Sequence, residues 1–184
     1  MATLGEAKIL GGVGAILLLF PFVNLVGWIL VLIAVKYISD ITRDRSVFDN
    51  MLYAVILAII GTVAVTLIIV LPFLGLGGIT GPIDLTNPAA IFLGVFTLIG
   101  LVVGWIFALI SALFLRRSFD SIATHLNVPT FATAGLIYLI GAALMIVIVG
   151  FLLVGLIAPI LMIVAFFSIK EQQPAAGVAQ PPFA

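Results

Sequence analysis

Four long runs of apolar residues dominate this sequence, at roughly 9–38, 48–74, 89–115 and 132–169. Away from the ends of these runs there is no Asp, Glu, Lys, Arg or His. Because 65% of the residues are hydrophobic and only 8% are charged, against roughly 25% charged in soluble domains, a water-soluble fold is excluded. Spans inside a bilayer must satisfy their own backbone groups, and continuous rather than alternating runs favour helices over a barrel. The sequence therefore predicts an all-α, polytopic transmembrane helix bundle.

The lengths of the runs indicate how many times the chain crosses. The second and third runs have the length of single spans, since about 20 residues cross a core of ~30 Å. The last run, 132–169, would be about 57 Å long as one helix, so we expect it to fold back at Gly150 or Gly155. The first run is interrupted by Pro21, Asn24 and Gly27. It forms either one kinked helix or a hairpin.

Two charged islands, residues 36–49 and 116–125, separate these runs as polar loops. By contrast, the loop 75–88 has no Lys or Arg and one acid, Asp84. Positively charged loops remain in the cytoplasm, so both islands are predicted to be cytoplasmic and loop 75–88 external. The basic residues that would fix this orientation are Lys36, Arg43, Arg45, Arg116 and Arg117.

Two terminal hairpins around two long spans give six membrane segments, and they place both termini, with Lys8 and Lys170, in the cytoplasm. The alternative is four long spans, which leaves both lysines outside. We predict one transmembrane domain over residues 1–171 and a flexible tail rich in Pro, Ala and Gln over 172–184, which is too polar to form a core.

Charge and residue types exclude several functions. Proton-coupled carriers, pumps and voltage sensors need ionisable groups at membrane depth, and none is found there. The chain has no cysteine and one histidine, His125, so thiolate catalysis and a zinc site are not expected. We expect no enzyme activity, no cofactor and no metal, and the net charge of zero gives no reason to expect nucleic-acid binding.

Small residues recur every four positions in the two middle runs. Such faces let helices approach closely in lipid, either within one bundle or between chains. We predict helix packing through Gly100, Gly104, Ala108 and Ala112 in the third run, and through Ala54, Ala58 and Thr62, continued by Thr66, in the second.

The islands also have candidate interactions of their own. Their basic residues can contact anionic lipid headgroups or serve only as topology anchors, and ion pairs such as Arg117 with Asp44 are equally plausible. His125 and Asp120 lie five residues apart. They are either an acid–base pair or pH sensor, or a loop histidine in solvent, which we favour because no nucleophile or second ligand accompanies them.

Several stretches together resemble a known family: KILGGVGAILLL, VLIAVKYISD, ALFLRRSFDSIA and FATAGLIYLIGA, followed by AFFSI. They are similar to the archaeal integral membrane family called domain of unknown function 996, over roughly residues 4–169. The resemblance implies an archaeal plasma-membrane protein without assigned activity or catalytic residues, and it favours the N-terminal hairpin. A fainter similarity leads to small four-helix membrane proteins related to the chloroplast import component Tic20.

These observations favour a non-catalytic structural or accessory subunit, which packs with itself as a homo-oligomer or within a larger membrane complex. The alternative is a channel or uncoupled carrier for a small neutral solute. The two differ in one observable feature, which is whether polar residues of the spans converge on one wet cavity or are scattered through helix contacts. The residues concerned are Asn24, Thr62, Thr66, Thr97 and Ser111.

Overall fold

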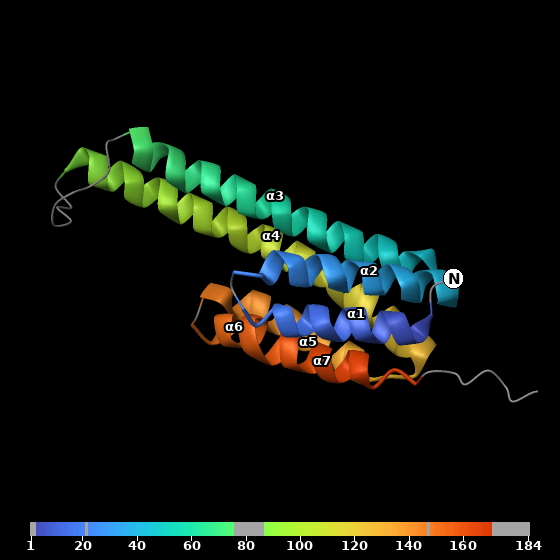
Figure 1. Ribbon diagram of the computed structural model, residues 1–184. Coiled ribbons are helices and arrows are strands. Elements are labelled where there is room, and N and C mark those ends of the chain that lie inside the picture. The colour runs from blue at the N-terminus through green and yellow to red at the C-terminus, as the bar shows by residue number, and fades with distance from the viewer. Residues whose placement is uncertain (1–2, 21, 76–86, 147, 171–184) are drawn as a thin grey trace, which may run out of the picture.

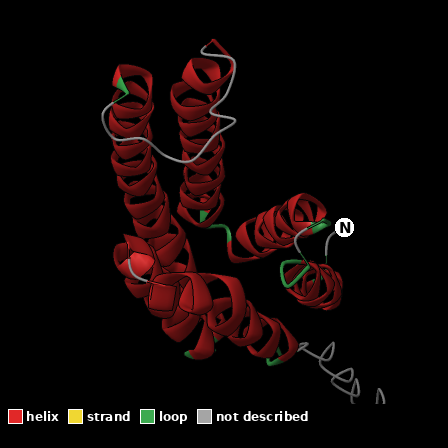
Figure 2. Cartoon of the chain, turned by 90° about the vertical axis from the view of Figure 1, so that its left-hand side faces the viewer, coloured by secondary structure: helices red, strands yellow, loops and turns green. Residues whose placement is uncertain are grey.

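The computed structural model describes residues 3–20, 22–75, 87–146 and 148–170, and throughout these ranges the chain forms helices and no strand (Figure 2). The predicted all-α class is confirmed. The elements are α1 (Leu4–Leu17), α2 (Asn24–Thr42), α3 (Arg45–Gly75), α4 (Pro88–Leu126), α5 (Thr130–Ala143), the 3₁₀ turn η1 (Leu144–Ile146), α6 (Ile148–Leu152), the π-helical turn η2 (Leu153–Ile157) and α7 (Ala158–Phe167). The predicted tail, 172–184, lies outside the described residues.

The first apolar run forms two helices, α1 and α2, rather than one kinked helix. The side chain of Asn24 donates from Nδ2 to the carbonyl of Leu18 at 3.0 Å, which satisfies a carbonyl left free at the end of α1. The two helices touch at Gly14 and Gly27, where a Cβ on either residue would lie within 3.0 Å of the other's carbonyl oxygen. Glycine at both positions therefore lets the two backbones meet.

The last apolar run also folds back, but the predicted position of its turn is wrong. The chain turns at η1, before Gly150, and Gly155 lies within the π-helical turn. A Cβ on Gly150 would overlap the backbone of Leu144, so this glycine serves the close approach of the returning helix and not the reversal itself. The π turn directly precedes Pro159, whose ring cannot fit the preceding turn of a regular α-helix.

The two charged islands are not polar loops, which corrects the expectation from the sequence. In the first island, α2 ends at Arg43 in the left-handed conformation, with φ 56°, and α3 begins only two residues later. Asp44 supplies the cap, because its Oδ1 accepts the backbone N–H of Ser46 at 2.9 Å.

The second island lies entirely within α4, which has 39 residues and ends at Leu126. Arg116 and Asp120 are one helical turn apart and pair at 3.5 Å, so the charges are compatible with continued helix. Asn127 ends the helix with φ 53°, a conformation that Asn tolerates well. At the other end, Asn87 caps the helix, and its Oδ1 accepts the N–H of Ala89 at 3.0 Å.

The helices run back and forth, so that the start of α1, the α2–α3 and α4–α5 junctions and the end of α7 all lie at one end of the molecule (Figure 1). All seven Lys and Arg residues lie within ten residues of one of these positions. We call this the charged end. The aromatic centre of the core lies towards it, where Phe131 packs edge-on between Phe119 and Phe166 with ring centroids 5.6 and 5.0 Å away.

Away from the charged end, α3 and α4 extend as a pair beyond the other helices (Figures 1 and 2). We call this pair the arm. Among the described residues, four helical stretches are long and apolar enough to cross a membrane. They are Asn24–Thr42, Arg45–Leu74, Pro88–Leu126 and Val149–Phe167, whereas Thr130–Ile146 is apolar but shorter. The count of six membrane segments thus remains a prediction.

Candidate functional site

The interface between α3 and α4 is formed by small residues and two buried serines. Ser111 Oγ donates to the carbonyl of Ala54 at 2.8 Å, and Ser118 Oγ donates to the carbonyl of Val47 at 2.7 Å. The two serines are seven residues apart on α4, and their acceptors Ala54 and Val47 are seven residues apart on α3. This is the spacing of two antiparallel helices packed along one seam. Each serine thereby satisfies its hydroxyl inside the apolar interface.

The small residues predicted for packing divide between this seam and a cavity beside it. Gly100 and Gly104 face α3, where an added Cβ would lie 2.7 Å from Ile69 and 2.6 Å from Val65. Ala54 and Ala112 are fully buried. The remaining three, Ala58, Thr62 and Ala108, line the cavity, as do Gly100 and Gly104.

Sequence reasoning missed two contributors to the seam. Gly61 faces Phe107, whose Cβ would lie 2.6 Å from an added Cβ, and Ser118 was not considered because it follows the two arginines. The seven-residue spacing of Ser111 and Ser118 was the available signal. It was obscured because the charged island had been interpreted as a loop.

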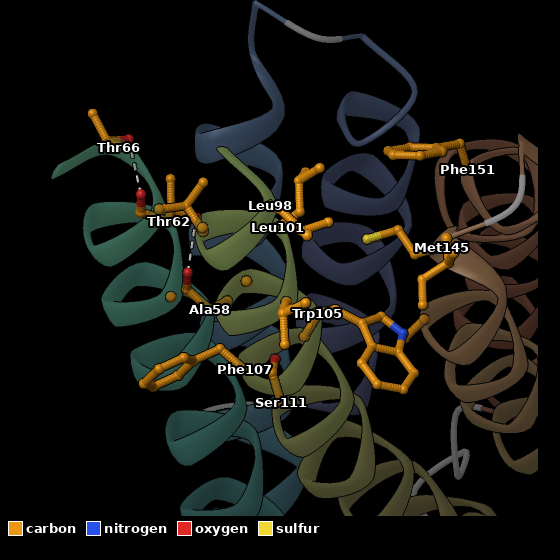
Figure 3. A pocket seen from close by; sticks show the side chains of 18 of the residues that line it. Ala58, Thr62, Thr66, Leu98, Leu101, Trp105, Phe107, Ser111, Met145 and Phe151 are labelled. Carbon is orange, nitrogen blue, oxygen red and sulfur yellow. Dashed lines mark hydrogen bonds between the residues drawn. The ribbon is translucent and has the colours of Figure 1, made fainter. Parts of the chain in front are cut away.

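The cavity has a volume of about 750 Å³ and lies where the arm meets the turn between α5 and α6 (Figure 3). Leu98, Leu101 and Trp105 of α4 extend towards Met145 and Phe151, while Thr62 lies on α3. Side chains at its edge are strongly exposed, for example Leu98 at 64% and Phe151 at 62%. The cavity therefore opens sideways on the apolar surface. Its lining comprises Ala58, Gly61, Thr62, Val65, Thr66, Leu98, Gly100, Leu101, Val102, Gly104, Trp105, Phe107, Ala108, Ser111, Tyr138, Ala142, Met145, Ile146 and Phe151.

Three hydroxyl groups of the cavity already have acceptors in the helices. Thr62 donates to Ala58 and Thr66 donates to Thr62, both at 2.8 Å (Figure 3), and Ser111 donates to Ala54. The indole N–H of Trp105 donates to the carbonyl of Ala143 at 3.2 Å, where α5 ends and its carbonyls lack helical partners. These polar groups thus stabilise the helices, and the lining is mostly apolar.

Of the five polar residues singled out in the spans, three line this cavity: Thr62, Thr66 and Ser111. Asn24 instead caps α1, and Thr97 is not among the lining residues. The polar residues therefore converge only in part.

The five basic residues predicted as headgroup contacts or anchors fall into two groups at the charged end. The first group borders a hollow of about 400 Å³, which is lined by Lys36, Ser39, Asp40, Arg43, Arg45 and Phe48. Arg116 and Arg117 lie elsewhere, on α4. Arg116 pairs with Asp120 as described, and the guanidinium of Arg117 lies 5.5 Å from the ring centre of Phe114.

The two islands are joined by His125 and Asp44, not by the Arg117–Asp44 pair suggested above. His125 Nε2 lies 2.8 Å from Asp44 Oδ2, and the two side chains are 38% and 29% exposed. His125 is exposed as expected, but it occupies the last turn of α4 and not a loop. Its partner is Asp44 and not Asp120. Hydrogen bonds from Ser46, and then from His125, lower the pKa of Asp44 below its ordinary value.

Comparison with known proteins now gives the affiliation. The family described as "Protein of unknown function (DUF996)" matches residues 23–160, which span α2 to the start of α7. The chain belongs to this family. The match confirms the resemblance and covers a narrower range than residues 4–169.

A relative matches the chain over a longer range. The chain is 35% identical over 173 residues to "Uncharacterized protein MJ1644" of Methanocaldococcus jannaschii, and the alignment covers 91% of this chain and 94% of that protein. No solved structure matches the chain. As a DUF996 member whose described residues include four helices fit to cross a bilayer, the chain is a multi-pass membrane protein.

Proposed function

We propose that this DUF996 protein is a non-catalytic accessory subunit, which presents the arm to the helices of a membrane partner. The arm is the observation that carries this proposal. Its two helices bury small residues and serines against each other, while large apolar side chains face outward over its length. Examples are Ile59, Val63 and Leu67 on α3 and Ile91 and Ile99 on α4, all at least 46% exposed.

The mechanism of such a subunit is packing. Because small residues and two interhelical hydrogen bonds hold α3 and α4 together, the pair can behave as one rigid element. A helix that is apolar on all sides is surrounded by lipid or by other helices. The same arrangement supports assembly with another chain or with a second copy, and the experiment below separates these outcomes.

In the membrane, the proposed arrangement has six segments, with both termini and both charged islands in the cytoplasm and loop 75–88 outside. The gathering of all seven basic residues at one end supports this orientation. Residues 76–86 lie outside the described part of the chain, so their placement rests on the two helices that flank them. The plasma membrane is the proposed location, and anionic headgroups are proposed to contact Lys36, Arg43 and Arg45 around the hollow at the charged end.

A channel or uncoupled carrier for a neutral solute is the second candidate, and the cavity with Thr62, Thr66 and Ser111 favours it. The sideways opening and the hydroxyls bonded within the bundle argue against it. We therefore place the accessory role first.

Copurification from native membranes in a mild detergent tests the proposal. We expect a membrane partner, or a second copy, at constant stoichiometry by mass spectrometry. Leu67→Trp and Ile99→Trp, on the outer faces of the arm, should reduce the amount of copurified partner about tenfold. A bulky side chain in a packed interface costs about 1–3 kcal/mol of binding free energy. Leu25→Trp is the matched control, because Leu25 is 67% exposed but lies on α2. A lone protein that makes liposomes permeable to glycerol would overturn the accessory role in favour of the carrier.

A further inference from the structure

The cavity between the arm and the α5–α6 turn has the properties of a binding site for an apolar molecule. Its volume of about 750 Å³ lies within the range of roughly 300–1,000 Å³ typical of ligand sites. No charged residue is among its lining residues. The hydroxyls of Thr62 and Ser111 and the indole of Trp105 donate to backbone carbonyls, so a ligand here gains from apolar contact.

The position of the cavity indicates which apolar molecule reaches it. The opening is flanked by strongly exposed apolar residues from separate elements, among them Leu101 on α4, Ile146 in η1 and Phe151 on α6. A ligand enters from the side without passing the charged end. In a multi-pass protein the phase in contact with this surface is the hydrocarbon of the bilayer.

We propose that the cavity binds one hydrocarbon chain of a membrane lipid, held between α4 and the α5–α6 turn. Trp105 fixes one wall, because its bond to Ala143 ties α4 to the end of α5. The hydrocarbon chain of the lipid fills a space beside the arm that α5 and α6 are too short to cover. The site requires the membrane location but not the accessory role.

Trp105 provides the test, since the chain has only two tryptophans. Trp28 lies against Tyr138 with ring centroids 6.0 Å apart, so Trp28→Phe keeps an aromatic ring there and leaves Trp105 as the only fluorophore of its kind. The Trp28→Phe variant is purified in detergent and titrated with phosphatidylglycerol whose acyl chains carry bromine, which quenches tryptophan fluorescence on contact. We expect saturable quenching at one lipid per protein.

Filling the cavity should abolish this saturation. Ala108→Phe occupies it from α4, and Thr62→Phe narrows it from the exposed side of α3, so that one variant remains informative if the other fails to fold. Each is expected to weaken lipid binding at least about tenfold. Every methylene group of the lipid that is displaced from the cavity lowers the affinity roughly fourfold. The matched control is Gly94→Phe on α4, where an added Cβ meets nothing within 4 Å. Helix content and melting temperature establish that each variant is folded.

Two results would overturn the proposal. Quenching that rises without saturation, or that is unchanged in folded Ala108→Phe and Thr62→Phe, would mean ordinary contact with surrounding lipid. Absence of quenching in protein that retains a copurified partner or forms a dimer would mean that a helix, not a lipid chain, fills the cavity. The second outcome would leave the accessory role standing, which separates the two proposals.

Discussion

Asp44 is the residue at which the two charged islands meet. It caps the start of α3 through Ser46 and contacts His125 from the end of α4. A sequence reading placed both residues in polar loops and could not pair them, because 81 residues separate them along the chain. Their contact depends on α4 continuing through the arginines and on the two-residue junction between α2 and α3.

The lowered pKa of Asp44 predicts a pH dependence with a definite sign. Its carboxylate is bonded in the folded state, so the stabilisation is complete above the ordinary pKa of 3.8. It is lost as the pH falls through the lower pKa of the folded protein. Asp44→Asn should therefore reduce stability near neutral pH and flatten the acid limb of the profile, measured as melting temperature by circular dichroism between pH 2 and about 7.

Asp120→Asn is the matched control for that measurement. Asp120 pairs with Arg116 on the surface of one helix, and exposed pairs of this kind contribute little. Its acid limb should follow that of the unchanged protein. Equal flattening in both variants would show that Asp44 has no special part in joining the islands.

At the scale of elements, the sequence predicted the type of secondary structure well and the boundaries of the helices poorly. Apolar runs are local signals, and helices form over each of them. The extension of α4 through Arg116 and Arg117 and the turn before Gly150 depend on neighbouring helices. The same holds for the cavity, because its walls come from separate parts of the chain.

The seam of α3 and α4 gives a prediction at this scale. Replacing Ser111 and Ser118 together by Ala removes two hydrogen bonds between the helices, each worth about 0.6–1.7 kcal/mol in a membrane protein. We expect the double variant to lose about 1–3 kcal/mol of unfolding free energy. The measurement is unfolding by sodium dodecyl sulfate in mixed micelles, followed by circular dichroism.

Thr124→Ala on the same helix is the control, because Thr124 donates to Asp120 within α4 and not across the interface. It should unfold like the unchanged protein. If the double serine variant does so too, the seam is held by the close packing at Gly61, Gly100 and Gly104 alone.

For the whole molecule, the decisive property is which helix ends share a side of the membrane. The chain has no native cysteine, so single cysteines report accessibility without background. In the six-segment arrangement, Ala2→Cys and Thr124→Cys react only from the cytoplasm, while Phe20→Cys and Thr86→Cys react only from outside. Impermeant maleimide applied to intact cells and to inverted vesicles measures this.

One position decides between the alternatives. If α1 does not cross the bilayer, Ala2→Cys should react from outside together with Phe20→Cys, whereas the other two cysteines keep their sides. If Thr124→Cys and Thr86→Cys react from the same compartment, α3 and α4 do not both cross, and the whole orientation is wrong.

The unequal reach of the helices has a further consequence for the surrounding bilayer. The apolar part of α4, residues 88–115, is about 42 Å long, whereas the 14 residues of α5 extend only about 21 Å. No single hydrocarbon thickness matches both, so the long helices must tilt or thicken the lipid around them while the short ones thin it. Such hydrophobic mismatch makes the protein sensitive to lipid chain length, and it would sort the protein towards membrane regions whose thickness suits its longest helices.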